Sequence, residues 1–132
     1  LPLHPAKYAK LLGEKLKNSD TKVWLINTGW SGGSYGTGSR IKLSYTRAMI
    51  TAALSGDLDT DTFETLPIFD LAYPKTCPGI PKEILDPKET WSDKSLYDEM
   101  ANALASKFVE NFEVFKKETD PAILAAAPKV MV

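Results

Sequence analysis

The fold of this chain depends on residues 27–50, which read NTGWSGGSYGTGSRIKLSYTRAMI. A glycine-rich loop separates an apolar run from a helical pattern, an order in which nucleotide-handling proteins bring a backbone loop against a ligand. The loop is not a P-loop, because Gly38 is followed by Ser39 and Arg40, where that motif requires Lys and then Ser or Thr. It also has only the first two glycines of a dinucleotide fingerprint. The residues themselves therefore predict a glycine-rich loop that carries an arginine.

On the N-terminal side of this loop, the pattern predicts a helix and then a buried strand. Pro5 suits a first helical turn, and the helix is expected over residues 5–17. Residues 22–27 are apolar almost throughout, β-branched in part and too short for a helix, which is typical of a buried strand. The apolar positions that recur at helical spacing before it are Tyr8, Leu11, Leu12 and Leu16.

On the C-terminal side, a second helix is predicted from Leu43, with Gly56 as its C-terminal stop. Residues 65–71 predict another strand, with Pro67 at an edge or a bulge because proline lacks a donor for the ladder. Prolines at positions 74, 78, 81 and 87 then predict an irregular segment.

The longest helix is predicted over residues 93–117, with Ser92 or Asp93 as its N-cap. A last short helix follows Asp120 and Pro121 and extends through Ala127. Core positions of the longest helix are expected at Leu96, Met100, Leu104, Phe108, Phe112 and Phe115.

Few strands with about four helices predict a mixed fold, between α/β and α+β. This is too little sheet for a complete two-layer domain. We therefore expect the sheet to include strands from elsewhere.

Composition and charge exclude several function classes. The chain has 132 residues, of which 43% are hydrophobic and 25% charged, with a net charge of −1, as in ordinary soluble globular proteins. Basic residues are scattered among acidic ones, so no electrostatic case for nucleic acid arises. No apolar run reaches the roughly 20 residues needed to cross a bilayer, so no membrane partner is expected. Cys77 is the single cysteine, which favours a reducing, cytoplasmic setting.

Several motifs of this chain together resemble the C-terminal part of the ATP-dependent phosphoenolpyruvate carboxykinases. The resemblance covers nearly all of the sequence, whereas that family's chain is about four times longer. The motifs are Leu3-His4-Pro5, Tyr8-Ala9, Asn27-Thr28-Gly29-Trp30 with the glycines after it, Arg40-Ile41, Tyr45-Thr46-Arg47-Ala48, Thr65-Leu66-Pro67-Ile68-Phe69 and Ile84-Leu85-Asp86-Pro87.

The resemblance implies that residues 1–132 are the C-terminal part of a mononucleotide-binding carboxykinase domain and not a complete domain. The complete enzyme would convert oxaloacetate and ATP to phosphoenolpyruvate, CO2 and ADP in gluconeogenesis. The family's lysine-bearing P-loop and its ligands for divalent metal, Mg or Mn, have no counterpart in this sequence. The segment alone, separated from the rest of the carboxykinase chain, is therefore expected to be inactive.

The resemblance also implies the binding residues. Arg40 and Ile41 match positions that contact the adenine end of ATP, and Thr46 matches a further nucleotide-contacting threonine. No catalytic residue and no metal ligand is assigned within the segment. Without the resemblance, the favoured interpretation of Arg40 is an arginine that pins its own loop through backbone carbonyls. Ile41 would then be an apolar anchor, and Thr46 a first-turn helix residue.

Other interpretations stay open at this point. The alternative function is a non-catalytic, stand-alone nucleotide-binding or assembly module. Homo-oligomerisation is compatible with either function. Asn27 and Thr28 fit ligand binding and local turn chemistry equally well, whereas Trp30 is expected to pack and His4 is not expected to be catalytic.

Overall fold

The structure, a computed structural model, describes residues 2–59 and 62–131. Three of the helices described begin at a proline or after a capping side chain, and the strands are short. The elements in chain order are α1 (Pro5–Lys17), β1 (Trp30–Ser31), β2 (Ser39–Arg40), α2 (Leu43–Ser55), β3 (Phe63–Thr65), β4 (Ala72–Pro74), α3 (Lys82–Leu85), α4 (Lys94–Phe112), the 3-10 helix η1 (Glu113–Glu118) and α5 (Pro121–Ala125).

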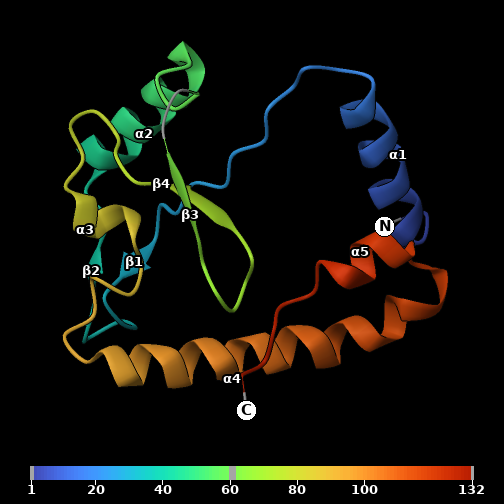
Figure 1. The fold of residues 1–132 in the computed structure, drawn as a ribbon. Coiled ribbons are helices and arrows are strands. Elements are labelled where there is room, and N and C mark those ends of the chain that lie inside the picture. Colours follow the sequence, from blue (N-terminus) through green and yellow to red (C-terminus); the bar gives the residue numbers. More distant parts are fainter. Residues whose placement is uncertain (1, 60–61, 132) are drawn as a thin grey trace.

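The chain forms an open ring with α4 along one side (Figure 1). The helices α1 and α5 lie at one end of α4, and the elements α2, α3, β1 and β2 lie at the other end. The connection between α1 and β1 returns across the side opposite α4. The glycine loop, residues 29–39, therefore lies at the end of the molecule that is distant from α1.

Two separate hairpins contain all the strands of the described residues. Strand β1 pairs with β2, and β3 pairs with β4, each pair antiparallel. The expected mixture of helix with little sheet is confirmed at this coarse level. Among these residues no strand links the two hairpins into one sheet.

Both strand predictions outside the glycine loop are wrong in this chain. Residues 22–27 have no regular secondary structure and form no ladder, because the described residues offer them no strand partner. Residues 66–70 form the turn between β3 and β4, where Leu66 N–H donates to the Leu71 carbonyl at 2.9 Å and Asp70 has a positive φ of 54°. Pro67 lies inside this turn, where a missing backbone donor costs nothing.

The helix predictions are largely confirmed, since local capping determines them. Gly56 ends α2 in the left-handed conformation at φ 79°. Asp93 and Asp120 cap α4 and α5 as expected, and Pro121 occupies the first turn of α5. Two C-terminal ends differ: α4 gives way to the 3-10 helix η1 at Glu113, and α5 ends at Ala125.

The core is small and divided into two clusters. The first lies between α2 and the segment before α3, and the second lies under α4. Only the small residues Ala101 and Ala105 of α4 are buried, so the expected core stripe of that helix is instead 42–52% exposed at its first four positions. The described chain covers only the alanine face of α4, chiefly with the turn that carries Ile68 and Phe69. The buried clusters are Ala52, Leu58, Cys77 and Ile80, and Ile68, Ala101 and Ala105.

Within the described ranges, the helices are too short or too polar for any of them to span a bilayer.

The N-cap of α4 gives the first prediction. The Asp93 carboxylate accepts hydrogen bonds from the backbone N–H groups of Ser95 at 2.9 Å and Leu96 at 3.1 Å. Replacing such a cap by alanine leaves two amides without a protein partner, so Asp93→Ala should lower the free energy of unfolding by about 1 kcal/mol. Urea unfolding measures this difference. Asp93→Ser, which keeps an acceptor, is the control, and equal losses in both variants would contradict a capping role.

Candidate functional site

The glycine loop is closed by the β1–β2 hairpin. Trp30 pairs with Arg40 and Ser31 pairs with Ser39, and the Ile41 N–H extends the ladder by donating to the Gly29 carbonyl at 2.9 Å. At the tip, the Ser34 carbonyl accepts hydrogen bonds from the N–H groups of residues 37 and 38, at 3.0 and 2.8 Å. The loop is therefore ordered by its own backbone, and Arg40 lies at its exit.

Glycine is required at two positions of the loop by close approach. A Cβ at Gly38 would lie 2.5 Å from the Ser31 carbonyl oxygen and would also clash with the Gly33 carbonyl oxygen. A Cβ at Gly32, which has φ 78°, would lie 2.7 Å from the Thr90 carbonyl oxygen. These contacts leave no room for side chains on the inner side of the hairpin.

Thr90 anchors the glycine loop to the segment before α4. Its hydroxyl donates to the Pro87 carbonyl at 2.7 Å and accepts from the Ser31 hydroxyl at 3.0 Å. Residues 31 and 90 are far apart in the sequence, so this pair is a tertiary restraint on the loop. It fixes the hairpin relative to the first turn of α4.

Local turn chemistry explains Asn27. Its side-chain oxygen accepts from the Gly29 N–H at 2.9 Å, and its side-chain nitrogen donates to the Trp30 carbonyl at 3.3 Å. Trp30 packs edge-on against Tyr35, with ring centroids 5.2 Å apart. Both residues therefore shape the entrance to the glycine loop. Asn27 bonds to the backbone, as local turn chemistry, one of its two interpretations, requires.

The three predicted binding residues are close in sequence, but the structure places them in different environments. Arg40 is exposed at the end of β2, and among the described residues its guanidinium has no hydrogen-bond or ion-pair partner. The structure therefore does not support the interpretation that Arg40 pins its own loop. Ile41 is half-buried, and Thr46 is buried in the first turn of α2, at 8% exposure. Their role in binding stays a prediction.

A polar cluster on the β3–β4 hairpin escaped the sequence analysis. The Tyr73 hydroxyl lies 2.8 Å from the Glu64 carboxylate and 3.2 Å from that of Asp86, and Lys75 bonds to Glu64 at 2.7 Å. The hydrogen bond from Lys75, followed by that from Tyr73, lowers the pKa of Glu64 below its ordinary value. Burial, followed by the contact with Glu64, raises the pKa of the Tyr73 phenol. Glu64 and Tyr73 are cross-strand partners, so only the register of β3 and β4 could have revealed the cluster.

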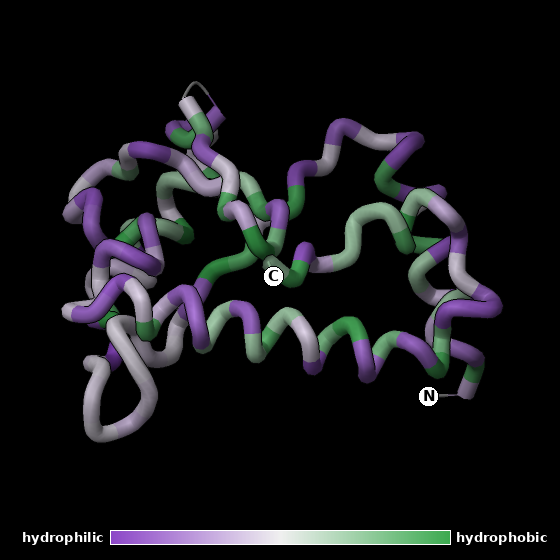
Figure 2. The backbone as a smooth tube through the Cα atoms, turned by 60° about the horizontal axis from the view of Figure 1, so that its bottom comes forward, coloured by the Kyte–Doolittle hydropathy of each residue, from purple (hydrophilic) through white to green (hydrophobic). Residues whose placement is uncertain are grey.

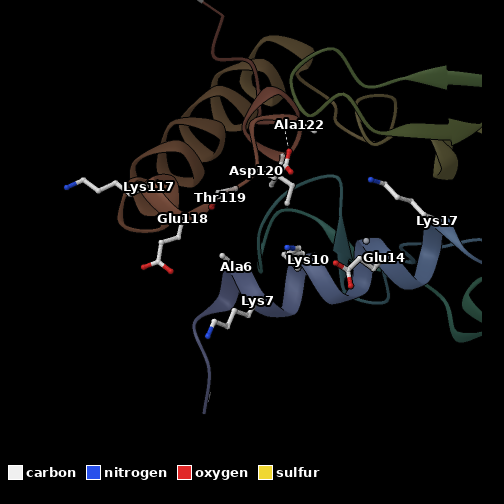
Figure 3. Close-up of a pocket in the computed structure, with 13 residues that line it drawn as sticks. Ala6, Lys7, Lys10, Glu14, Lys17, Lys117, Glu118, Thr119, Asp120 and Ala122 are labelled. Atoms are coloured by element: carbon white, nitrogen blue, oxygen red, sulfur yellow. Dashed lines mark hydrogen bonds between the residues drawn. The ribbon is translucent and has the colours of Figure 1, made fainter.

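A surface hollow of about 660 Å³ lies between α1 and the η1–α5 region (Figure 3). Figure 3 shows Lys7, Lys10 and Glu14 along α1, with Asp120 on the opposite wall. A smaller hollow, about 340 Å³, adjoins Tyr73. Neither of these two hollows is lined by Arg40, Ile41 or Thr46.

The groups that could hold a metal are dispersed. Within residues 2–59 and 62–131, no three His, Cys, Asp or Glu side chains gather as a metal site would require. His4 instead accepts from the Ala6 N–H at 3.3 Å through Nδ1 and caps α1. The same nitrogen lies 3.4 Å from Glu118, and it cannot accept the first bond and donate to the second at once. The described residues therefore do not fit a resident divalent metal.

Comparison with known proteins shows one consistent family. The profile of the ATP-dependent phosphoenolpyruvate carboxykinases matches residues 1–83. The phosphoenolpyruvate carboxykinase (ATP) of Flavobacterium johnsoniae is 57% identical over 128 residues, which cover 97% of this chain and 24% of that protein. Those of Caldanaerobacter subterraneus and Christiangramia forsetii are 56% and 48% identical, over 98% and 97% of this chain and 25% and 24% of theirs. The chain thus spans about a quarter of the length of these relatives.

The close approach at Gly38 gives the second prediction. Gly38→Ala places a methyl group against two backbone carbonyls that cannot move without opening the hairpin. We expect a loss of about 1–3 kcal/mol in the free energy of unfolding. Gly13→Ala in α1 is the matched control, because nothing lies within 4 Å of its Cβ position and alanine favours a helix by about 0.5–1 kcal/mol. Urea unfolding should show opposite signs for the two variants, and equal signs would refute the steric account.

The cluster on the β3–β4 hairpin gives the third prediction. Lys75→Met removes the strongest cause of the shift, so the pKa of Glu64 should rise toward its ordinary value while the Tyr73 bond keeps part of the shift. Carboxyl-carbon NMR titration measures it directly. Lys82→Met is the control, since Lys82 lines the same hollow without an ion pair to Glu64. A Glu64 pKa that responds equally to both variants would show a diffuse charge effect rather than the specific bond.

Proposed function

The chain belongs to the family of ATP-dependent phosphoenolpyruvate carboxykinases, and on that premise we propose that it acts as the C-terminal segment of such an enzyme. The complete protein would decarboxylate oxaloacetate and phosphorylate the resulting enolate with ATP, as a cytoplasmic enzyme of gluconeogenesis. Because the chain spans about a quarter of its relatives, this activity is assigned to the complete protein. Within the complete protein, residues 1–132 would form one wall of the ATP pocket.

The observation that carries this proposal is the position of Arg40. An ordered hairpin presents the side chain at its exit, exposed and without an ion-pair or hydrogen-bond partner among the described residues. A guanidinium keeps its charge at every working pH and can stack on a purine or bond to ribose and phosphate. Such a contact contributes about 1 kcal/mol or more when water is excluded. The rigid glycine loop would hold it in place before the nucleotide binds.

Ile41 and Thr46 have smaller parts in the proposed pocket. Ile41 directly follows Arg40 and is half-buried, so it offers apolar surface to the adenine ring beside the guanidinium. Thr46 belongs to the first turn of α2, whose N-cap residue Lys42 makes no side-chain capping bond. The hydroxyl of Thr46 would contact the nucleotide where this helix begins.

Phosphoryl transfer needs groups that the described residues do not bring together. It depends on a bound divalent metal and on cations that neutralise the transferring phosphate. Since these residues form no site that fits such a metal, we assign the metal and catalytic groups to the other part of the carboxykinase chain. Residues 1–132 would then complete, but not constitute, the nucleotide-binding domain.

Arg40 gives the fourth prediction. In the complete enzyme, Arg40→Ala should raise the KM for ATP by about tenfold, the equivalent of about 1.4 kcal/mol, because it removes a contact to the adenine end. The KM for oxaloacetate should change much less, because that substrate makes no contact with this wall. Steady-state kinetics with each substrate varied in turn measures both values.

Arg47→Ala is the matched control for this experiment. Arg47 is also an exposed arginine, in the first half of α2, and the proposal gives it no contact with ATP. Its KM for ATP should stay within about twofold of the unmodified enzyme. Equal changes in both KM values for Arg40→Ala would count against the adenine contact.

A further inference from the structure

One face of the β1–β2 hairpin, here called the outer face, carries Trp30 and Arg40 directly opposite each other. Directly opposed residues of antiparallel strands project their side chains to the same side of the sheet. Because the Ile41 N–H bonds to the Gly29 carbonyl, the next pair along the ladder is a non-hydrogen-bonded one. Trp30 and Arg40 form this pair, in which the side chains of two antiparallel strands lie closest together.

The other face of the hairpin is used for anchoring. Ser31 follows Trp30 in β1, and its hydroxyl bonds to that of Thr90 at 3.0 Å. Successive strand residues point to opposite faces, so Trp30 points away from this anchor. Figure 2 shows the glycine loop as a pale stretch that projects from one end of the molecule. In the described part of the chain, the outer face of the projecting loop is therefore open, and Trp30 is 42% exposed.

Tyr35 adds a second aromatic ring to the outer face. It lies in the turn that the Ser34 carbonyl closes with the Thr37 N–H, and Gly36 follows it with the positive φ of 92° that a type II turn requires at that position. The Tyr35 ring meets the Trp30 ring edge-on, at 5.2 Å between centroids. The backbone under Tyr35 is thus fixed by the turn, while 85% of the residue stays exposed.

Two rings beside one guanidinium favour a flat aromatic ligand. A nucleobase stacks on an aromatic side chain through its π face, and a guanidinium stacks on the same kind of ring. A bicyclic purine covers more of such a surface than a monocyclic pyrimidine does. A small dicarboxylate such as oxaloacetate has no ring to stack and could use only the charge of Arg40. The chemistry of the outer face therefore fits the base of a nucleotide better than it fits the other substrate.

We propose that Trp30 and Tyr35 are further nucleotide-contacting residues, on which the purine ring of ATP stacks beside Arg40. Trp30, which belongs to the ladder, supplies the fixed part of this surface, and the more exposed Tyr35 supplies its outer edge. The pair would give the enzyme a preference for purine over pyrimidine nucleotides. This inference rests on the proposed function, which assigns Arg40 to the adenine end of ATP. It gives the glycine loop a role in selecting the base, in place of the phosphate binding that such loops commonly perform.

Titration calorimetry of the intact enzyme with ATP, GTP and CTP tests the stacking. Tyr35→Ala should raise the dissociation constants for ATP and GTP by a similar factor of about five or more, because stacking does not depend on which purine is bound. The dissociation constant for CTP should rise by a clearly smaller factor. Tyr35→Phe keeps the ring and should restore the affinity for both purines.

Two further variants serve as matched comparisons. Tyr8→Ala is the control, because Tyr8 is also a partly exposed tyrosine, in α1 at the far end of the molecule. It should leave all three dissociation constants within about twofold of the unmodified enzyme. Trp30→Phe keeps an aromatic ring in the ladder and should weaken ATP binding less than Trp30→Ala does. The Tm of every variant is measured as well, since Trp30 also packs the loop.

The outcomes separate stacking from a purely structural role of the two rings. Equal weakening of ATP and CTP by Tyr35→Ala would overturn the proposal, because a disordered loop affects every nucleotide alike. An unchanged affinity for ATP together with a lower Tm would overturn it in favour of packing against protein.

The same variants distinguish this inference from the proposed function. If Arg40→Ala raises the KM for ATP while Tyr35→Ala leaves the affinity for ATP unchanged, the stacking alone is refuted. If ATP binding depends on Tyr35 but the intact protein has no carboxykinase activity, the proposed function alone is refuted.

Discussion

The first turn of α4 is the restraint on which the rest of the arrangement depends. Asp93 caps it, and Lys88 bonds to the Asp98 carboxylate at 2.8 and 2.7 Å, which holds the preceding segment against the helix. Thr90, in that same segment, fixes the glycine loop through the Ser31 hydroxyl. The other end of α4 leads through η1 to the helices at the far end of the ring. One helix terminus thus sets the position of the hairpin that carries Arg40.

The second feature of the molecule is a shortage of buried apolar surface. Its two buried clusters consist of small and medium side chains, and none of the large side chains in the described part of the chain is fully buried. Local hydrogen bonds and caps give well-formed helices and hairpins, but they do not replace burial as the source of stability. The exposed stripe of α4 and the exposed side chains of Val23 and Leu25 are therefore the surfaces on which a larger domain would be built.

Helix positions and the glycine loop were predictable, because their signals are local. Pro5, Gly56, Asp93 and Asp120 act within one turn of their own positions, so the sequence alone locates helix ends to within a few residues. Strands were not predictable in the same way, since a strand exists only where a partner lies beside it. Residues 22–27 have strand composition without a ladder, and residues 66–70 became a turn because Ala72–Pro74 returned to pair with Phe63–Thr65.

The sequence by itself determined the family, through motifs that need no geometry, and the order of helices, through capping and apolar spacing. It also singled out Arg40 as a charged residue of a glycine-rich loop. Only the tertiary structure decided that the side chain of this arginine is exposed and has no ion-pair or hydrogen-bond partner among the described residues. The tertiary structure likewise decided that Asn27 bonds to backbone and that Tyr73 lies between two carboxylates. The physical reason is that these properties depend on which distant groups approach within hydrogen-bonding distance, and sequence spacing fixes such approaches only inside a single turn or helix.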